Sequence, residues 1–220
     1  MEGILRFLSR FENADGLLEK LQSWVFVEWS DANNHVQDVN YPSNMLWARA
    51  LETAARLYDQ PKLAQKAEKI RETIRRQSYD GTWFHDNAIR QADGTLKRGE
   101  ATTETCQYYA LYFDTATPKT HPEFWKRVTE ELGPNRRKAM VHPNVAMANA
   151  FIGNYLRMML LDRAGLKDQL KREISEYFLE MAERTGTLWE KDAPEASCCH
   201  GFASYIAVLI DGCTPGHASK

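Results

Sequence analysis

Residues 42–81 read PSNMLWARALETAARLYDQPKLAQKAEKIRETIRRQSYDG and contain two consecutive helical patterns. In the first pattern the apolar residues Met45, Ala48 and Leu51 recur at spacings of three, which places them on one face of a helix. Pro61 favours the start of a second helix, because proline is well tolerated in the first helical turn. Two helices joined by a few residues form an antiparallel hairpin. This stretch therefore predicts a helical hairpin.

The same periodicity extends along most of the chain and predicts about eight helices. Two of them, at residues 62–77 and 167–184, are heavily charged on one face. Others, at residues 102–113, 144–161 and 197–210, are nearly uncharged. Amphipathic helices that alternate with apolar ones predict an outer and an inner ring. The full set of expected helices is 4–11, 42–58, 61–79, 102–113, 121–132, 144–161, 167–184 and 197–210.

The stretch at residues 82–100 loses the helical period and carries Asp93-Gly94, so it predicts a small β-like insertion. No repeat of fixed period and no low-complexity linker is visible, and we treat residues 1–220 as a single all-α domain. A closed double ring of twelve helices would need roughly 330 residues at this helix spacing. The chain has 220, so the sequence predicts either an incomplete toroid or an open helical array.

Composition excludes several classes of protein. The chain is 43% hydrophobic and 26% charged, which excludes disorder, and its formal net charge of -2 gives no global reason to expect nucleic acid as a partner. Its apolar stretches are too short to cross a membrane. The N-terminus lacks the features of a signal peptide, so we expect a cytoplasmic protein.

The reactive residue types form no recognised motif. Four cysteines, at positions 106, 198, 199 and 213, are too few for a disulfide scaffold and are interpreted as reduced thiols. The histidines lack metal-ligand spacing, and no phosphate-binding loop or dinucleotide motif is present. The sequence therefore predicts neither a metal site nor a cofactor.

Three segments could carry chemistry. In TGTLWEKDAPEASCCHGFAS (residues 185–204), Trp189 could stack on a sugar and the neighbouring Glu190 could act as a general base. The loop WVFVEWSDANNHVQDVNYPSN (residues 24–44) is rich in aromatic and carboxylate side chains, which is typical of a binding loop. In TTETCQYYALYF (residues 102–113), Glu104 lies near the start of an apolar helix and could mark a pocket mouth.

Each segment also has a purely structural interpretation. Trp189 could fill the core while Glu190 is a solvated loop charge. The loop at residues 24–44 could be ordered by Asn and Asp side chains that cap its own turns. Glu104 could be a first-turn acid favoured by the helix dipole after a Thr N-cap.

Residues 11–58, 104–113, 151–161 and 183–207 resemble stretches of bacterial α-L-rhamnosidase-like glycoside hydrolases with a six-hairpin, (α/α)6 catalytic toroid. That family catalyses inverting hydrolysis, which requires one carboxylic acid and one carboxylate. Its general base is a glutamate in a Thr/Leu-Trp-Glu context, which Glu190 in TLWEKD resembles. Where relatives have Asn-His in the following inner helix, this chain has Cys199-His200.

The resemblance also implies what the chain lacks. The family's general acid lies in an acidic, Arg-containing motif before the stretch that residues 11–20 resemble, and no such motif is present. The chain would then correspond to the C-terminal half to two-thirds of a catalytic domain, without its N-terminal helices and β-sandwich domains. An incomplete toroid would also expose apolar inner-helix surface at Phe151, Ile152, Leu156 and Met159, which predicts self-association.

On this resemblance we expect Glu190 to be the general base for hydrolysis of a terminal α-L-rhamnoside. The expected substrate contacts are Trp189, His200, Glu28, Trp29 and Glu104. The expected partner is a carbohydrate, without nucleic acid or membrane. The alternatives are a catalytically inactive carbohydrate-binding remnant and a helical scaffold protein.

Overall fold

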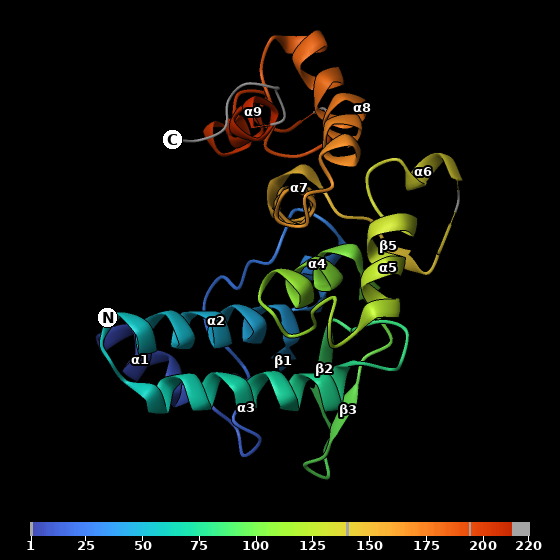
Figure 1. Cartoon of the computed structure of the whole chain (residues 1–220). Helices are drawn as coiled ribbons and strands as arrows, with labels where there is room; N and C mark the ends of the chain where they lie inside the picture. The colour runs from blue at the N-terminus through green and yellow to red at the C-terminus, as the bar shows by residue number, and fades with distance from the viewer. Residues whose placement is uncertain (1, 140, 194, 213–220) are drawn as a thin grey trace.

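The computed structural model describes residues 2–139, 141–193 and 195–212, and the chain is built mainly from helices (Figure 1). Within these ranges no helix is long and apolar enough to cross a membrane. Cys213 lies outside the described residues. The helices are α1 (Glu2–Leu8), α2 (Tyr41–Leu57), α3 (Pro61–Ser78), α4 (Glu104–Tyr112), α5 (Pro122–Glu131), α6 (Arg136–Ala139), α7 (Tyr155–Arg163), α8 (Lys167–Thr185) and α9 (Tyr205–Asp211).

Helices α2 and α3 form the predicted antiparallel hairpin. The Asn40 side chain caps α2 by accepting a hydrogen bond of 2.9 Å from the Ser43 amide. Pro61 lies in the first turn of α3, as the sequence predicts. The apolar faces of the two helices, including Met45 and Ile74, lie in the larger of two hydrophobic clusters.

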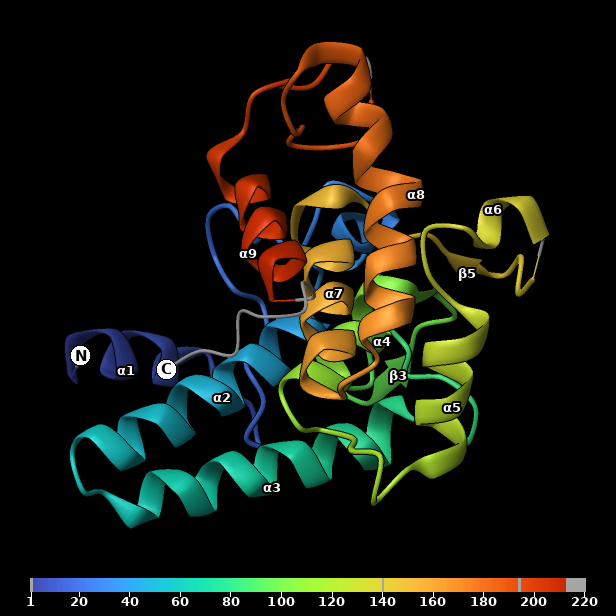
Figure 2. The same ribbon diagram turned by 45° about the horizontal axis from the view of Figure 1, so that its top comes forward.

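The helices pack in two layers (Figures 1 and 2). In one layer α2 contacts α4, α4 contacts α7, and α7 contacts α9. In the other layer, α3 packs on α2, α5 packs on α4, and α8 packs on α7. Residues 104–111 of α4 are all buried, whereas α8 buries one face only. The predicted distinction between apolar and amphipathic helices is therefore confirmed for α4 and α8, whereas α9, which was predicted as an apolar inner helix, buries only Ile206 and Leu209.

A small antiparallel sheet lies at the predicted β insertion. It has the order β1 (Val39–Asn40), β2 (Asn87–Arg90) and β3 (Leu96–Arg98), with Ala88 opposite Arg98. Gly94 turns the chain between β2 and β3 with a φ of +84°, a conformation that favours glycine. A second, parallel pair joins β4 (Thr102–Thr103) to β5 (Val145–Ala146).

The structure differs from the prediction before α7. The apolar pattern predicts a helix from residue 144, but α7 begins at Tyr155. The preceding residues form β5 and then an irregular turn over Ala150–Asn154, in which Ile152 has a φ of +74° and Gly153 lies against a buried carboxylate. Helix α9 likewise begins later than predicted, at Tyr205, after a 3-10 turn over Gly201–Ser204.

The apolar inner-helix surface that was expected to be exposed packs against other parts of the chain. Leu156 is buried, and Phe151, Ile152 and Met159 are half-buried against neighbouring side chains. The prediction that these four residues lack neighbours is therefore wrong, because α8, α9 and the loop before α2 pack around them. The large apolar side chains that are exposed lie elsewhere and include Ile4, Phe7, Trp24, Leu57, Leu179 and Val208.

Candidate functional site

Two of the predicted site residues meet directly. The indole Nε1 of Trp29 donates a hydrogen bond of 2.9 Å to Oε1 of Glu190, and the two residues are 161 positions apart in the sequence. Both side chains are half-buried. In Figures 1 and 2 the blue loop before α2 accordingly reaches the orange and red C-terminal part of the chain. An indole N–H is a donor only, so this contact orients the carboxylate of Glu190 without taking up its second oxygen.

The loop that carries Glu190 is closed on itself. The Glu190 amide donates to the Ser197 carbonyl at 2.9 Å, and the His200 amide donates to the Leu188 carbonyl at 3.0 Å. These bonds place His200 in the same loop as Glu190. The His200 ring packs edge-on against Phe151, with a centroid distance of 5.3 Å. Its Nδ1 is buried and has no hydrogen-bond partner within the described part of the chain.

Aromatic rings continue outward from the Trp29–Glu190 pair. Trp29 packs against Phe26 at 4.9 Å and against Trp24 at 6.1 Å between ring centroids. Phe26 in turn contacts Phe151 at 5.8 Å. The Trp24 side chain is 71% exposed, so one end of this cluster faces solvent. An exposed aromatic surface beside a carboxylate and a histidine suits a ligand with both apolar faces and hydroxyl groups.

Glu28 lies beneath this surface and does not line it. The side chain is fully buried, and its Oε2 accepts hydrogen bonds from the hydroxyls of Ser30 and Thr105. Its Oε1 accepts from the amides of Asn149, at 3.0 Å, and Gly153, at 2.6 Å. Burial raises the pKa of Glu28 to about 8, although all four hydrogen bonds act in the opposite direction.

Trp189 is also placed in the interior. It is 5% exposed, belongs to the smaller hydrophobic cluster formed mainly by α7, α8 and α9, and donates its indole N–H to the Thr185 hydroxyl at 2.8 Å. The Arg184 guanidinium lies 4.9 Å from the centre of its ring. Both the face and the polar edge of Trp189 are therefore occupied by the protein, which corresponds to the core interpretation of this residue.

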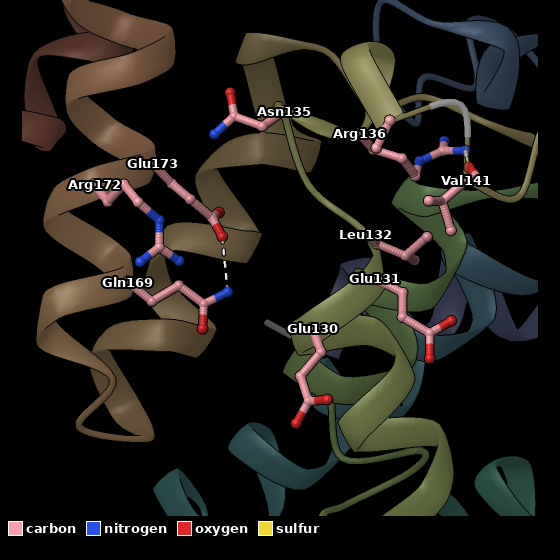
Figure 3. Close-up of a pocket in the computed structure, with 10 residues that line it drawn as sticks. Glu130, Glu131, Leu132, Asn135, Arg136, Val141, Gln169, Arg172 and Glu173 are labelled. Atoms are coloured by element: carbon pink, nitrogen blue, oxygen red, sulfur yellow. Dashed lines mark hydrogen bonds between the residues drawn. The ribbon is translucent and has the colours of Figure 1, made fainter.

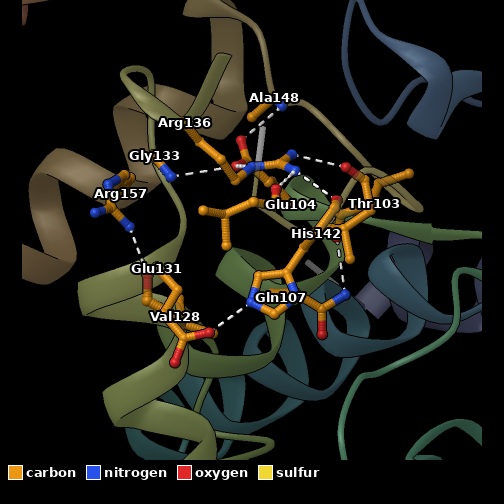
Figure 4. Close-up of polar contacts among 12 residues, drawn as sticks. Thr103, Glu104, Gln107, Val128, Glu131, Gly133, Arg136, His142, Ala148 and Arg157 are labelled. Carbon is orange, nitrogen blue, oxygen red and sulfur yellow. Dashed lines mark hydrogen bonds and ion pairs between the residues drawn. The ribbon is translucent and has the colours of Figure 1, made fainter. Parts of the chain in front are cut away.

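Glu104 is fully buried and paired with Arg136 (Figure 4). Its Oε1 lies 2.8 Å from Arg136 Nε and accepts the Gly133 amide at 3.1 Å, while its Oε2 accepts the Ala148 amide at 2.9 Å. Thr103 is the N-cap of α4 and accepts from the Cys106 amide at 3.1 Å. The N-cap is at Thr103, as the sequence predicts, and the fully buried Glu104 joins Gly133, Arg136 and Ala148 to α4.

A polar pocket of about 310 Å³ lies between α5, α6 and α8 (Figure 3). Arg136 and Glu173 in its wall are held in ion pairs, whereas Arg172 makes no hydrogen bond or ion pair to any described residue. None of the residues predicted from the sequence lines this pocket. The complete lining is Glu130, Glu131, Leu132, Asn135, Arg136, Ala139, Val141, Gln169, Arg172 and Glu173.

Asn149, which was not predicted from the sequence, connects two of the three candidate segments. Asn149 donates its amide to Glu28, donates its side-chain Nδ2 to the Trp29 carbonyl at 3.0 Å, and accepts the Asp192 amide on Oδ1 at 2.6 Å. The available signal was a polar Asn149 followed by Gly153 inside an otherwise apolar stretch. Within the described residues no group of three or more His, Cys, Asp or Glu side chains could hold a metal ion.

Comparison with known proteins gives a fold relationship only. No protein-family model matches the chain, and no curated protein matches it in sequence. Its fold is similar to a GH78 family rhamnosidase of Bacillus sp. GL1, with a TM-score of 0.75 and 17% identity over 94% of this chain and 22% of the other. It is also similar to a rhamnosidase from Klebsiella oxytoca solved with rhamnose bound, with a TM-score of 0.68 and 16% identity over 94% of this chain and 40% of the other.

The resemblance to rhamnosidases seen in the sequence is therefore confirmed at the level of the fold. The chain spans about a fifth to two fifths of the length of these two solved proteins. A shared fold can host different activities, so the function has to be argued from the site itself.

Proposed function

We propose that this chain is an arc of an (α/α)6 toroid that forms part of a glycoside hydrolase site for terminal α-L-rhamnosides. The two packed layers of helices and the similarity to two rhamnosidases support the proposal. The observation that carries it is the hydrogen bond of 2.9 Å from Trp29 to Glu190. It presents a half-buried, oriented carboxylate beside an aromatic surface.

Glu190 is the proposed general base. In inverting hydrolysis a carboxylate activates a water molecule that attacks the anomeric carbon, while an acid protonates the leaving oxygen on the opposite face. Oε1 of Glu190 is held by the Trp29 indole, so Oε2 can accept the proton of that water. We further propose that His200 and Trp29 contact the sugar, and that the buried Trp189 supports the loop from inside.

The remaining predicted carboxylates favour a second candidate function, carbohydrate binding without turnover. Inverting hydrolysis needs two carboxyl groups about 6.5–9.5 Å apart across the sugar. Glu28 and Glu104 are both fully buried and saturated with hydrogen bonds from the protein. Neither can protonate a substrate oxygen. Of these three glutamates, Glu190 is the one that is half-buried and not fully buried.

Hydrolysis of an aryl α-L-rhamnoside by the purified chain tests the first candidate. We expect turnover, because an activated aryl group leaves as a phenolate without protonation by an acid. We expect Glu190→Gln to abolish it, because an amide cannot accept the proton of water. The matched control is Glu195→Gln, an exposed glutamate of the same loop whose ion pair with Lys191 lies at the surface. Equal loss of turnover in both variants would contradict the assignment of Glu190.

If the wild-type chain gives no turnover, titration with L-rhamnose followed by tryptophan fluorescence tests the second candidate. Binding that Trp29→Phe weakens would support a carbohydrate-binding role. A folded chain with neither turnover nor binding would contradict both functions.

A further inference from the structure

The Trp29–Glu190 pair is supported by hydrogen bonds from a third segment of the chain. The Trp29 carbonyl accepts the Asn149 side chain at 3.0 Å, and the Asp192 amide, two residues after Glu190, donates to the same side chain at 2.6 Å. One amide side chain therefore fixes the main chain on both sides of the pair. We propose that Asn149, held in turn by Glu28, is a positioning residue that sets the geometry of Trp29 and Glu190.

Glu28 connects this arrangement to the core. Its Oε2 accepts the Thr105 hydroxyl, which belongs to the buried helix α4, and its Oε1 accepts the Asn149 and Gly153 amides. Asn149 is thus joined through Glu28 to the most buried helix of the fold. A rigid connection of this kind keeps a surface group in one orientation.

The turn between the two Glu28-bound amides is strained. Ile152 lies between Asn149 and Gly153 with a φ of +74° and a ψ of -70°, a conformation that β-branched residues rarely adopt. Such strain persists only where the surroundings impose it. The two amide bonds to one carboxylate oxygen provide that constraint, because they fix the turn on both sides of Ile152.

Gly153 is closely packed in this turn. A Cβ atom on Gly153 would lie 2.6 Å from Glu28 Oε1 and 2.6 Å from the Ala148 side chain. The main chain can approach the carboxylate this closely only with glycine at that position. The turn, the carboxylate and Asn149 therefore form one unit beneath the Trp29–Glu190 pair.

The test uses Asn149→Ala and Asn149→Asp, with Asn34→Ala as the matched control. Asn34 lies in the same N-terminal loop as Trp29, is exposed, and its side chain makes no hydrogen bond to a described residue. The alanine variant removes all three side-chain hydrogen bonds of Asn149, which include one of 2.7 Å accepted from the Ala150 amide. The aspartate variant keeps the acceptor for the Asp192 amide and loses the donor to the Trp29 carbonyl.

The primary readout is hydrogen exchange by NMR at the Trp29 indole N–H and the Asp192 amide, which needs no substrate. We expect Asn149→Ala to speed exchange at both sites about tenfold, because a lost hydrogen bond weakens protection by roughly that factor. Asn149→Asp should speed exchange at Trp29 while the Asp192 amide stays slow. Asn34→Ala should match the wild type. Unchanged exchange at Trp29 in both Asn149 variants overturns the proposal.

A role of this unit in catalysis rests on the proposed function. A second measurement tests the proposed function separately from the positioning role of Asn149. If the chain hydrolyses or binds a rhamnoside, we expect Asn149→Asp to lower kcat or affinity about tenfold. Faster exchange at Trp29 without any rhamnoside activity in the wild type would contradict the proposed function and leave the positioning role intact. If Asn149→Ala fails to fold, Asn149→Asp alone decides, since it retains the bond to Asp192.

Discussion

Arg157 on α7 and Glu173 on α8 form a two-pronged ion pair, with Nε 2.6 Å from Oε2 and Nη2 2.8 Å from Oε1. The side chains are 2% and 7% exposed. The Arg157 guanidinium also donates to the main-chain carbonyls of Val128 and Thr129 in α5. One buried charge thus joins three helices, and every polar atom of its guanidinium group has a partner.

Breaking this pair should be costly, because it leaves one charge buried without compensation. We expect Arg157→Met to lower the free energy of unfolding by about 3–5 kcal/mol, measured by urea denaturation. The control is Arg172→Met, on the exposed face of α8, where surface substitutions usually change stability by less than about 0.5 kcal/mol. Similar values for the two variants would show that the buried pair contributes no more than a surface charge.

The close approach at Gly153 predicts a second stability effect. In Gly153→Ala the added methyl group would meet the Glu28 carboxylate and the Ala148 side chain, each at 2.6 Å, so we expect a loss of about 1–3 kcal/mol. A Cβ atom on Gly201 would meet nothing within 4 Å, which makes Gly201→Ala the matched control. Thermal unfolding of both variants measures the difference, and an unaffected Gly153→Ala would mean that the turn has room to relax.

The burial of Glu28 predicts that the free energy of unfolding depends on pH. Burial raises its pKa from 4.5 to about 8, so between these values the native chain holds a proton that the unfolded chain has released. The unfolded state then binds fewer protons, and stability falls as the pH rises through this interval, by up to about 1.4 kcal/mol per pH unit. Glu28→Gln cannot titrate and should show a flatter profile.

The comparison isolates Glu28 because the titration of Asp86, a second buried acid with a raised pKa, is common to both proteins. Burial also raises the pKa of Asp86, to about 7, and its slope appears in both profiles. Urea denaturation at pH 5 and pH 7.5 provides the measurement. Parallel profiles for the two proteins would mean that Glu28 is ionised in the folded chain throughout.

The different burial of the cysteines predicts that their thiols differ in reactivity towards alkylating reagents. Cys106 is buried in α4, and burial raises the pKa of its thiol well above the usual value, whereas Cys199 is exposed. The thiolate is the reactive form, so we expect an alkylating reagent to modify Cys199 in the folded chain and Cys106 only after unfolding. Peptide mapping by mass spectrometry distinguishes the two sites. Rapid native labelling of Cys106 would show that α4 opens locally.

Much of the helical framework was predictable from the sequence, because the hairpin of α2 and α3 has strong periodicity and clear end signals. The residues before α7 were not, since their apolar pattern also suits a helix. The irregular turn there depends on Glu28, which lies more than a hundred positions away in the sequence. Periodicity reports on local structure and cannot detect such a tertiary constraint.

The candidate site was only partly predictable, because its contacts also join residues that lie far apart in the sequence. Trp29 and Glu190 were both selected from their own segments, and the structure brings them together. Glu104 was selected because a carboxylate at the start of an apolar helix suits either a pocket mouth or a first-turn acid favoured by the helix dipole. Neither interpretation includes its buried ion pair with Arg136, which lies 32 residues later and can be seen only in the folded chain.

The long separation between Trp29 and Glu190 also has a consequence for biosynthesis. The chain must grow by 161 further residues after Trp29 before its partner exists. At about 5–20 residues per second, the ribosome needs roughly 8–32 s for that growth. Helix α3 ends at Ser78, so the hairpin of α2 and α3 is complete for most of this time, whereas the aromatic side chains of the N-terminal loop still lack their C-terminal partners. Their apolar surface therefore stays exposed on the emerging chain until the C-terminal part has been made.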